Sequence, residues 1–167
     1  KNAKITSLKG AFEKCTNLTE VKMPEEITEI PHKAFDDCKS LKEVIIPKTV
    51  KKINMFAFGG CEALEKVVLP DGLEVIMDHA FACCFSLKNI ELPKGLKALG
   101  GEAFWRCSSL TEVEIPENVK FPEDVGIKQD YGTTHYGWFQ YCTNLTKVTI
   151  KNPSVYSGEC EGCINLK

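Results

Sequence analysis

The stretch AFACCFSLKNIELP, Ala80–Pro93, decides the fold because its pattern recurs along the chain. The pattern is AFxxCxxLxx, then Val or Ile, one further residue, a hydrophobic residue and Pro. Further copies begin at Ala11, Ala34, Ala57 and Ala103, a weaker one begins at Trp138, and the chain ends inside another, ECEGCINLK. The phenylalanines of five copies fall at positions 12, 35, 58, 81 and 104, a constant step of 23 residues. A repeat of this length indicates a solenoid.

Each repeat contains three parts that differ in hydrophobic spacing. The AFxxC part has apolar residues at helical spacing and predicts one short α or 3-10 turn. The LxxVxI part alternates apolar and polar residues and predicts a strand, which the following proline ends because it has no N–H to donate. The third part is an apolar pair, such as Val50 and Ile53, which is expected to pack the remaining side of each coil. Because no coil buries its apolar side alone, we expect about seven coils, stacked through one parallel strand ladder.

The bulk composition favours a single folded unit. The chain has 167 residues, 43% of them hydrophobic, and a net charge of −2. We expect one solenoid domain over residues 1–167, with an insertion at about 122–137, as a segment of a longer protein. Lys and Glu are interspersed, so no basic stripe favours a nucleic-acid partner. No apolar run reaches the ~20 residues that a membrane-spanning helix needs.

The cysteines follow the repeat rather than a pairing scheme. Stacked coils would bring one cysteine of each copy into a column with a spacing of about 4.8 Å. A free cysteine packs as a small buried hydrophobe, and an odd number leaves at least one thiol unpaired. We therefore expect buried structural thiols instead of disulfide bridges. The column comprises Cys15, Cys38, Cys61, Cys84, Cys107, Cys142 and Cys163, and only Cys83 and Cys160 lie outside it.

The 23-residue period breaks once, because 35 residues separate Phe104 from Phe139. The extra residues lie within Pro122–Gly137, a polar segment that carries Tyr131 and Tyr136. Insertions in repeat proteins map to loops on one face, and that face often binds a partner. The two tyrosines are therefore candidate partner-binding residues. A tolerated surface loop is the simpler alternative, since long loops cost little closure entropy.

The repeat AFxxCxxLxxVxIPxxVxxI resembles the BspA-type bacterial leucine-rich repeat over essentially the whole chain outside the insertion. This resemblance implies an α/β, right-handed leucine-rich-repeat solenoid. It also implies a secreted or surface-anchored bacterial protein, of a family associated with adhesion to host matrix proteins or other cells. The chain departs from the LxxLxLxxN repeat of other leucine-rich repeat proteins, since Glu26 and Thr49 stand where Asn would be. The horseshoe curvature of those other leucine-rich repeat proteins is therefore not expected for this chain.

The sequence predicts no catalytic, cofactor or metal site. The three histidines occupy unrelated positions of the repeat. His135 is the nearest to a column thiol, Cys142, but that thiol is expected to be buried. Cys160 and Cys163 have the spacing of half a zinc site, whereas a structural zinc needs four ligands. We therefore expect no enzyme activity and no cofactor.

Two surfaces are candidates for partner binding. On the expected strand face, Ile45 and Val68 form an apolar spot on adjacent coils, although strands favour β-branched residues in any case. On the outer side of the turn part, four aromatic residues interrupt polar columns. A contiguous apolar patch usually marks a contact surface, and Trp and Tyr often anchor such contacts. These four residues are Phe56, Phe85, Trp105 and Tyr141.

Taken together, these features predict an extracellular or cell-surface leucine-rich-repeat module that binds a protein ligand, as an adhesin does. The aromatic patch could instead receive a second copy of the chain or the insertion. Two other functions stay open at this point. One is a structural spacer that displays another domain, and the other is a non-catalytic accessory domain of a secreted enzyme.

Overall fold

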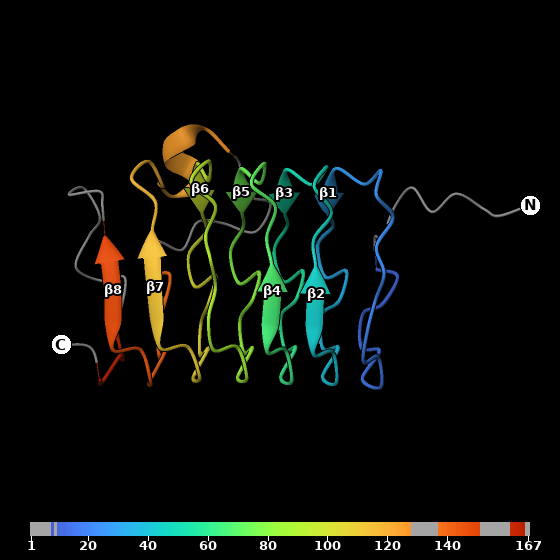
Figure 1. Ribbon diagram of the computed structural model, residues 1–167, viewed down its shortest axis with the longest axis horizontal. Helices are drawn as coiled ribbons and strands as arrows, with labels where there is room; N and C mark the ends of the chain where they lie inside the picture. Colours follow the sequence, from blue (N-terminus) through green and yellow to red (C-terminus); the bar gives the residue numbers. More distant parts are fainter. Residues whose placement is uncertain (1–7, 9, 128–136, 151–160, 166–167) are drawn as a thin grey trace, which may run out of the picture.

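The computed structural model describes residue 8 and residues 10–127, 137–150 and 161–165. The chain winds into coils that stack side by side along the long axis of the molecule, which confirms the predicted solenoid (Figure 1). The apolar side chains of successive coils meet in one continuous core that runs from Leu8 to Leu145.

The predicted strand ladder follows the LxxVxI parts. β2 (Glu43–Ile45) pairs in parallel with β4 (Lys66–Val68), and β7 (Glu112–Ile115) pairs in parallel with β8 (Lys147–Ile150). Within β2, buried Val44 lies between two exposed residues, as the period of two requires. The outward side chains of these four strands and of residues 88–92 form what we call the strand face.

The prediction of a strand in every repeat is wrong for two coils. Residues 18–23 form no strand, and residues 87–92 contribute only an isolated bridge from Asn89 to Glu112. Asn89 occupies the repeat position that Lys66 and Glu112 occupy in β4 and β7. Asparagine is depleted from strands, which fits the reduction of this stretch to a single bridge.

A second ladder, which the sequence had indicated only as packing, runs along another side of the coils. It consists of two-residue strands in the order β1-β3-β5-β6, all parallel. The second residue of each strand is fully buried and belongs to the apolar pair of the repeat. The strands are β1 (Glu29–Ile30), β3 (Lys52–Ile53), β5 (Val75–Ile76) and β6 (Ala98–Leu99).

The AFxxC parts form the predicted turns with alternating hydrogen bonds. The Asp36 N–H donates to the Lys33 carbonyl within the turn (3.3 Å), whereas the Phe35 N–H donates to Ala57 in the next coil (2.8 Å). Such alternation needs a left-handed residue on each side of the phenylalanine. Lys33 and Asp37 have φ values of 56° and 59°, and the same two positions recur in later coils. The turn therefore presents side chains two residues before and two after each Phe.

The phenylalanines of the repeat stack on one another through the core. The rings of Phe35 and Phe58 lie 5.2 Å apart between centroids, and those of Phe58 and Phe81 lie 5.3 Å apart, with interplanar angles of 3° and 6°. The stack continues across the insertion, because Phe104 and Phe139 also lie 5.3 Å apart. The extra residues thus leave the core column intact.

The cysteine column is a ladder of thiol hydrogen bonds. From Cys38 onward, each thiol of the column donates to the carbonyl of the Phe in the preceding coil, for example Cys61 to Phe35 (3.3 Å) and Cys142 to Phe104 (3.1 Å). All eight described cysteines are free thiols. The expected burial is confirmed for the middle of the column and wrong at its ends, where Cys15 is exposed and Cys163 half-buried. Among the described residues, each of these two thiols has a complete neighbouring coil on one side only.

The described part of the insertion packs against the second ladder. The 3-10 helix η1 (Pro122–Val125) follows Phe121 directly and contacts β6. Trp138, which stands where most copies have Ala, is only 1% exposed, and its ring lies 5.3 Å from that of Phe121. The insertion thus helps to house a large side chain in the core.

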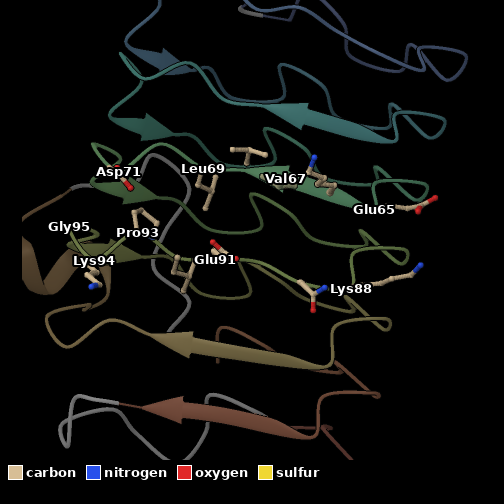
Figure 2. Close-up of a pocket in the computed structure, with 13 residues that line it drawn as sticks. Glu65, Val67, Leu69, Asp71, Lys88, Glu91, Pro93, Lys94 and Gly95 are labelled. Atoms are coloured by element: carbon tan, nitrogen blue, oxygen red, sulfur yellow. The ribbon is translucent and has the colours of Figure 1, made fainter.

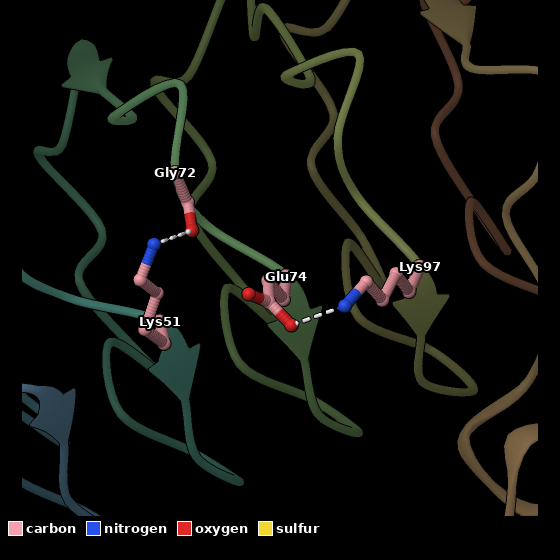
Figure 3. Close-up of polar contacts among 4 residues, drawn as sticks. All are labelled: Lys51, Gly72, Glu74 and Lys97. Carbon is pink, nitrogen blue, oxygen red and sulfur yellow. Dashed lines mark hydrogen bonds and ion pairs between the residues drawn. The ribbon is translucent and has the colours of Figure 1, made fainter.

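Charged side chains link neighbouring coils on the surface. Lys97 Nζ lies 2.6 Å from Glu74 Oε2, and Lys51 Nζ donates to the Gly72 carbonyl at 3.1 Å (Figure 3). Lys66 and Glu43 form a similar pair between β4 and β2 at 2.6 Å. Exposed pairs of this kind contribute little to stability because solvent screens them, so the core dominates the stability.

Candidate functional site

The strand face carries an exposed apolar ridge. Ile45 and Val68 are register partners in β2 and β4, and their side chains are 62% and 40% exposed. The structure therefore brings these two predicted residues together at the surface. Their neighbours Glu43 and Lys66 form an ion pair beside them.

A groove of about 900 Å³ lies next to this ridge, where the ladder is interrupted. Figure 2 shows Val67 and Leu69 of the β4 coil on one side of it and Pro93 on the other. Charged side chains, including Asp71 and Lys94, surround the apolar floor. Sequence reasoning missed this groove, although Asn89 in a strand position was the available signal.

A smaller groove of about 380 Å³ lies on the opposite side of the ridge, between β2 and the first coil. Its lining includes Val21, Met23, Ile45 and Pro47. This groove also coincides with a missing strand, that of residues 18–23. The ridge and the two grooves on either side of it thus form one continuous surface on the strand face.

The aromatic residues of the turn part divide into two groups. Phe56, Phe85 and Trp105 line a single hollow of about 260 Å³. Tyr141 does not line it, because Arg106 lies between, with its guanidinium carbon 4.5 Å from the Trp105 ring centroid and 6.0 Å from that of Tyr141. Phe85 and Tyr141 are 37% and 45% exposed, whereas the other two are half-buried.

His79 connects the aromatic hollow to a charged partner. Its ring stacks on Phe56 with centroids 4.7 Å apart, and its Nε2 lies 2.8 Å from Glu102 Oε2. Burial lowers the pKa of His79, and the Glu102 carboxylate opposes that shift. The His79 side chain is 23% exposed, so it is half-buried at the edge of the hollow.

The thiols whose pKa is raised are poorly suited to nucleophilic chemistry. Burial raises the pKa of Cys38 to about 11, and it also raises the pKa of half-buried Cys83. The thiolate is the reactive form, so a raised pKa disfavours reaction. Across the described ranges, no three His, Cys, Asp or Glu side chains are grouped so that they could hold a metal ion.

Several predicted residues lie outside the described part of the chain. Tyr131 and Tyr136 of the insertion belong to residues 128–136, and Cys160 belongs to residues 151–160. In the part that is described, no helix has the length and hydropathy to span a membrane.

Comparison with known proteins agrees with the geometry of the coils. The model of the BspA type leucine rich repeat region matches six copies of the repeat over residues 6–126. The chain belongs to this family. The predicted resemblance is therefore confirmed, and the thiol ladder and Phe stack are features of this BspA-type chain. Among curated proteins, none matches it.

Solved structures of leucine-rich repeat proteins share this BspA-type fold. One from Bacteroides ovatus is 32% identical, with a TM-score of 0.65, and the match covers 84% of this chain and 34% of that one. One from T. pallidum is 31% identical, with a TM-score of 0.63 and coverages of 84% and 72%. A leucine rich cell surface protein from Faecalibacterium prausnitzii is 21% identical, with a TM-score of 0.64 and coverages of 98% and 56%. The chain thus spans about a third of the Bacteroides ovatus protein's length.

Proposed function

We propose that this chain is a non-catalytic, protein-binding module of a secreted or cell-surface bacterial protein, and that its strand face contacts the ligand. The observation that carries the proposal is the exposed ridge of Ile45 and Val68 between two grooves. An apolar ridge beside apolar hollows can interdigitate with a protein surface, and the charged rim suits a specific contact. The similar Faecalibacterium protein, which is described as a cell surface protein, supports the location.

The proposal extends to the domain organisation. One Phe stack continues from Phe12 to Phe139 although the repeat period changes at the insertion, so we treat residues 1–167 as one solenoid module within a longer protein. Adhesion to host matrix proteins or to another cell is the activity that this arrangement fits best, because a long repeat surface offers many contacts with a large ligand.

Binding of purified host matrix proteins to the immobilised chain tests the proposal. The double variant Ile45→Asp with Val68→Asp should weaken saturable binding by tenfold or more, since it places two charges in an apolar contact. Both residues are exposed, so the variant should retain its thermal transition.

Val125→Asp is the matched control. Val125 is 41% exposed but lies in η1, away from the strand face. It should bind as the parent does. Absence of saturable binding to any matrix protein would favour the spacer function, and equal loss in the control would place the contact elsewhere.

A further inference from the structure

A hollow on the turn face arises because two consecutive coils carry small residues at both outward positions after the Phe. These positions hold Gly59 and Gly60 in one coil and Ala82 and Cys83 in the next. In the flanking coils the same two positions hold large polar or aromatic residues, which form opposite walls. One wall consists of Asp36 and Asp37, and the other consists of Trp105.

The acidic wall leans over the floor of the hollow. A side-chain carbon added at Gly59 would lie 2.8 Å from Asp36 Oδ1, and one added at Gly60 would lie 2.5 Å from Asp37 Oδ1. The two carboxylates therefore occupy the space above the glycines. A larger residue at either glycine would displace them.

The aromatic rings around the hollow already attract cations of this chain. Lys33 Nζ lies 5.9 Å from the centroid of Phe56, and the guanidinium of Arg106 lies 4.5 Å from that of Trp105. A cation over a ring face is attracted by the ring quadrupole. Phe85, at 37% exposure, offers a further ring edge at the rim.

One carboxylate at the hollow has no direct ion pair, although Lys39 interacts with it electrostatically. Lys33 Nζ lies 3.7 Å from Asp36 Oδ2, and Lys39 Nζ lies 2.7 Å from Glu62 Oε1. Among the described residues, Asp37 forms no ion pair within 4.0 Å. The hollow thus combines an aromatic wall with an acidic wall, in which Asp37 has no direct ion pair.

We propose that this hollow binds an arginine side chain of a partner polypeptide, with the guanidinium at Asp37 and the alkyl chain along Phe85 and Trp105. The planar guanidinium suits both contacts, because it pairs with a carboxylate and stacks on aromatic rings. The inference deepens the proposed function, since it rests on a polypeptide partner, and it adds a site remote from the strand face. It predicts that preferred ligands expose arginine beside apolar residues.

Titration of the ¹⁵N-labelled chain with the peptide acetyl-Gly-Ala-Arg-Ala-Gly-amide tests this site. The chain has two tryptophans, so their indole N–H signals give a built-in comparison. Saturable shifts are expected for half-buried Trp105 and not for Trp138, which is 1% exposed. The peptide with Gln in place of Arg should cause no such shift, and an equal shift would overturn the proposal.

Asp37→Asn is the variant that isolates the charge. Asn tolerates the left-handed backbone found at Asp37, with φ of 59°, so the fold should be retained. Loss of one partly exposed charge pair should weaken the peptide's affinity roughly fivefold. Asp71→Asn, which removes a carboxylate outside the hollow, should have no effect. An unchanged affinity in Asp37→Asn would overturn the proposal.

Two further titrations distinguish an arginine side chain from other occupants of the hollow, and one variant distinguishes this site from the strand face. Tetramethylammonium binding as tightly as the peptide would overturn the proposal in favour of a small organic cation. A Trp105 shift that depends on protein concentration without peptide would overturn it in favour of a second copy of the chain. The strand-face variant with Ile45→Asp and Val68→Asp should bind the peptide like the parent, so failure at one face is distinguishable from failure at the other.

Discussion

Among the described residues, the indole of Trp138 supplies a hydrogen bond that a backbone N–H supplies in earlier coils. In earlier coils the last residue of the apolar pair accepts an N–H from the next coil, as Ile53 does from Met77 (2.9 Å) and Ile76 from Gly100 (2.8 Å). The corresponding carbonyl of Leu99 instead accepts the indole Nε1–H of Trp138 at 2.8 Å. The Trp138 side chain thus both fills space in the core and donates a hydrogen bond to the buried Leu99 carbonyl.

Trp138→Phe should therefore destabilise the chain by more than its loss of volume suggests. An unsatisfied buried carbonyl costs about 1–3 kcal/mol, and urea denaturation at constant m-value would report that loss. Trp105→Phe is the control, because Trp105 is half-buried and its substitution should change the free energy of unfolding by under ~1 kcal/mol. Equal effects of the two changes would contradict this role of the indole N–H.

At the scale of the repeat, the Phe stack predicts a gradient of mutational cost. Phe81 is fully buried between the rings of Phe58 and Phe104, at 5.3 and 5.4 Å, whereas Phe12 is half-buried and is stacked on Phe35. Phe81→Ala should cost ~3–5 kcal/mol, and Phe12→Ala should cost clearly less. Chemical denaturation of both variants would check this, and a similar cost at both positions would argue against a stack that is weakest at its end.

The elements of the repeat were predictable where the same residue type recurs in each copy. They were not predictable where backbone geometry determines the local structure. The constant Phe and Cys positions predicted the period and the core, and the LxxVxI parts predicted the main ladder except in residues 18–23 and 87–92. The second ladder escaped prediction because an apolar pair such as Val50 and Ile53 is too short to show a strand period. The hollow beside Trp105 depends on left-handed residues such as Asp37, which no hydrophobic pattern marks. Only the run of small residues after Phe58 and Phe81 hinted at it.

At the scale of the whole molecule, the thiol ladder couples stability to alkaline pH. Burial raises the pKa of Cys38 to about 11 from the ordinary 9.0, and it raises the pKa of the other buried thiols of the column for which a shift is resolved. Those thiols are Cys61, Cys84 and Cys142. Each donates to a carbonyl of the preceding coil, so ionisation would also break a link between coils.

The sign of the pH effect follows from proton binding. Above pH 9.0 the unfolded chain releases these protons while the folded chain keeps them, so the free energy of unfolding falls as pH rises. Each thiol adds a slope of about 1.4 kcal/mol per pH unit until its folded-state pKa is reached. Denaturation between pH 8 and 11 in the presence of reductant should show this decline. Cys61→Ala should make the decline of unfolding free energy with pH less steep by the contribution of one proton, whatever the substitution does to stability at neutral pH. An unchanged slope would show that the ladder thiols do not govern alkaline stability.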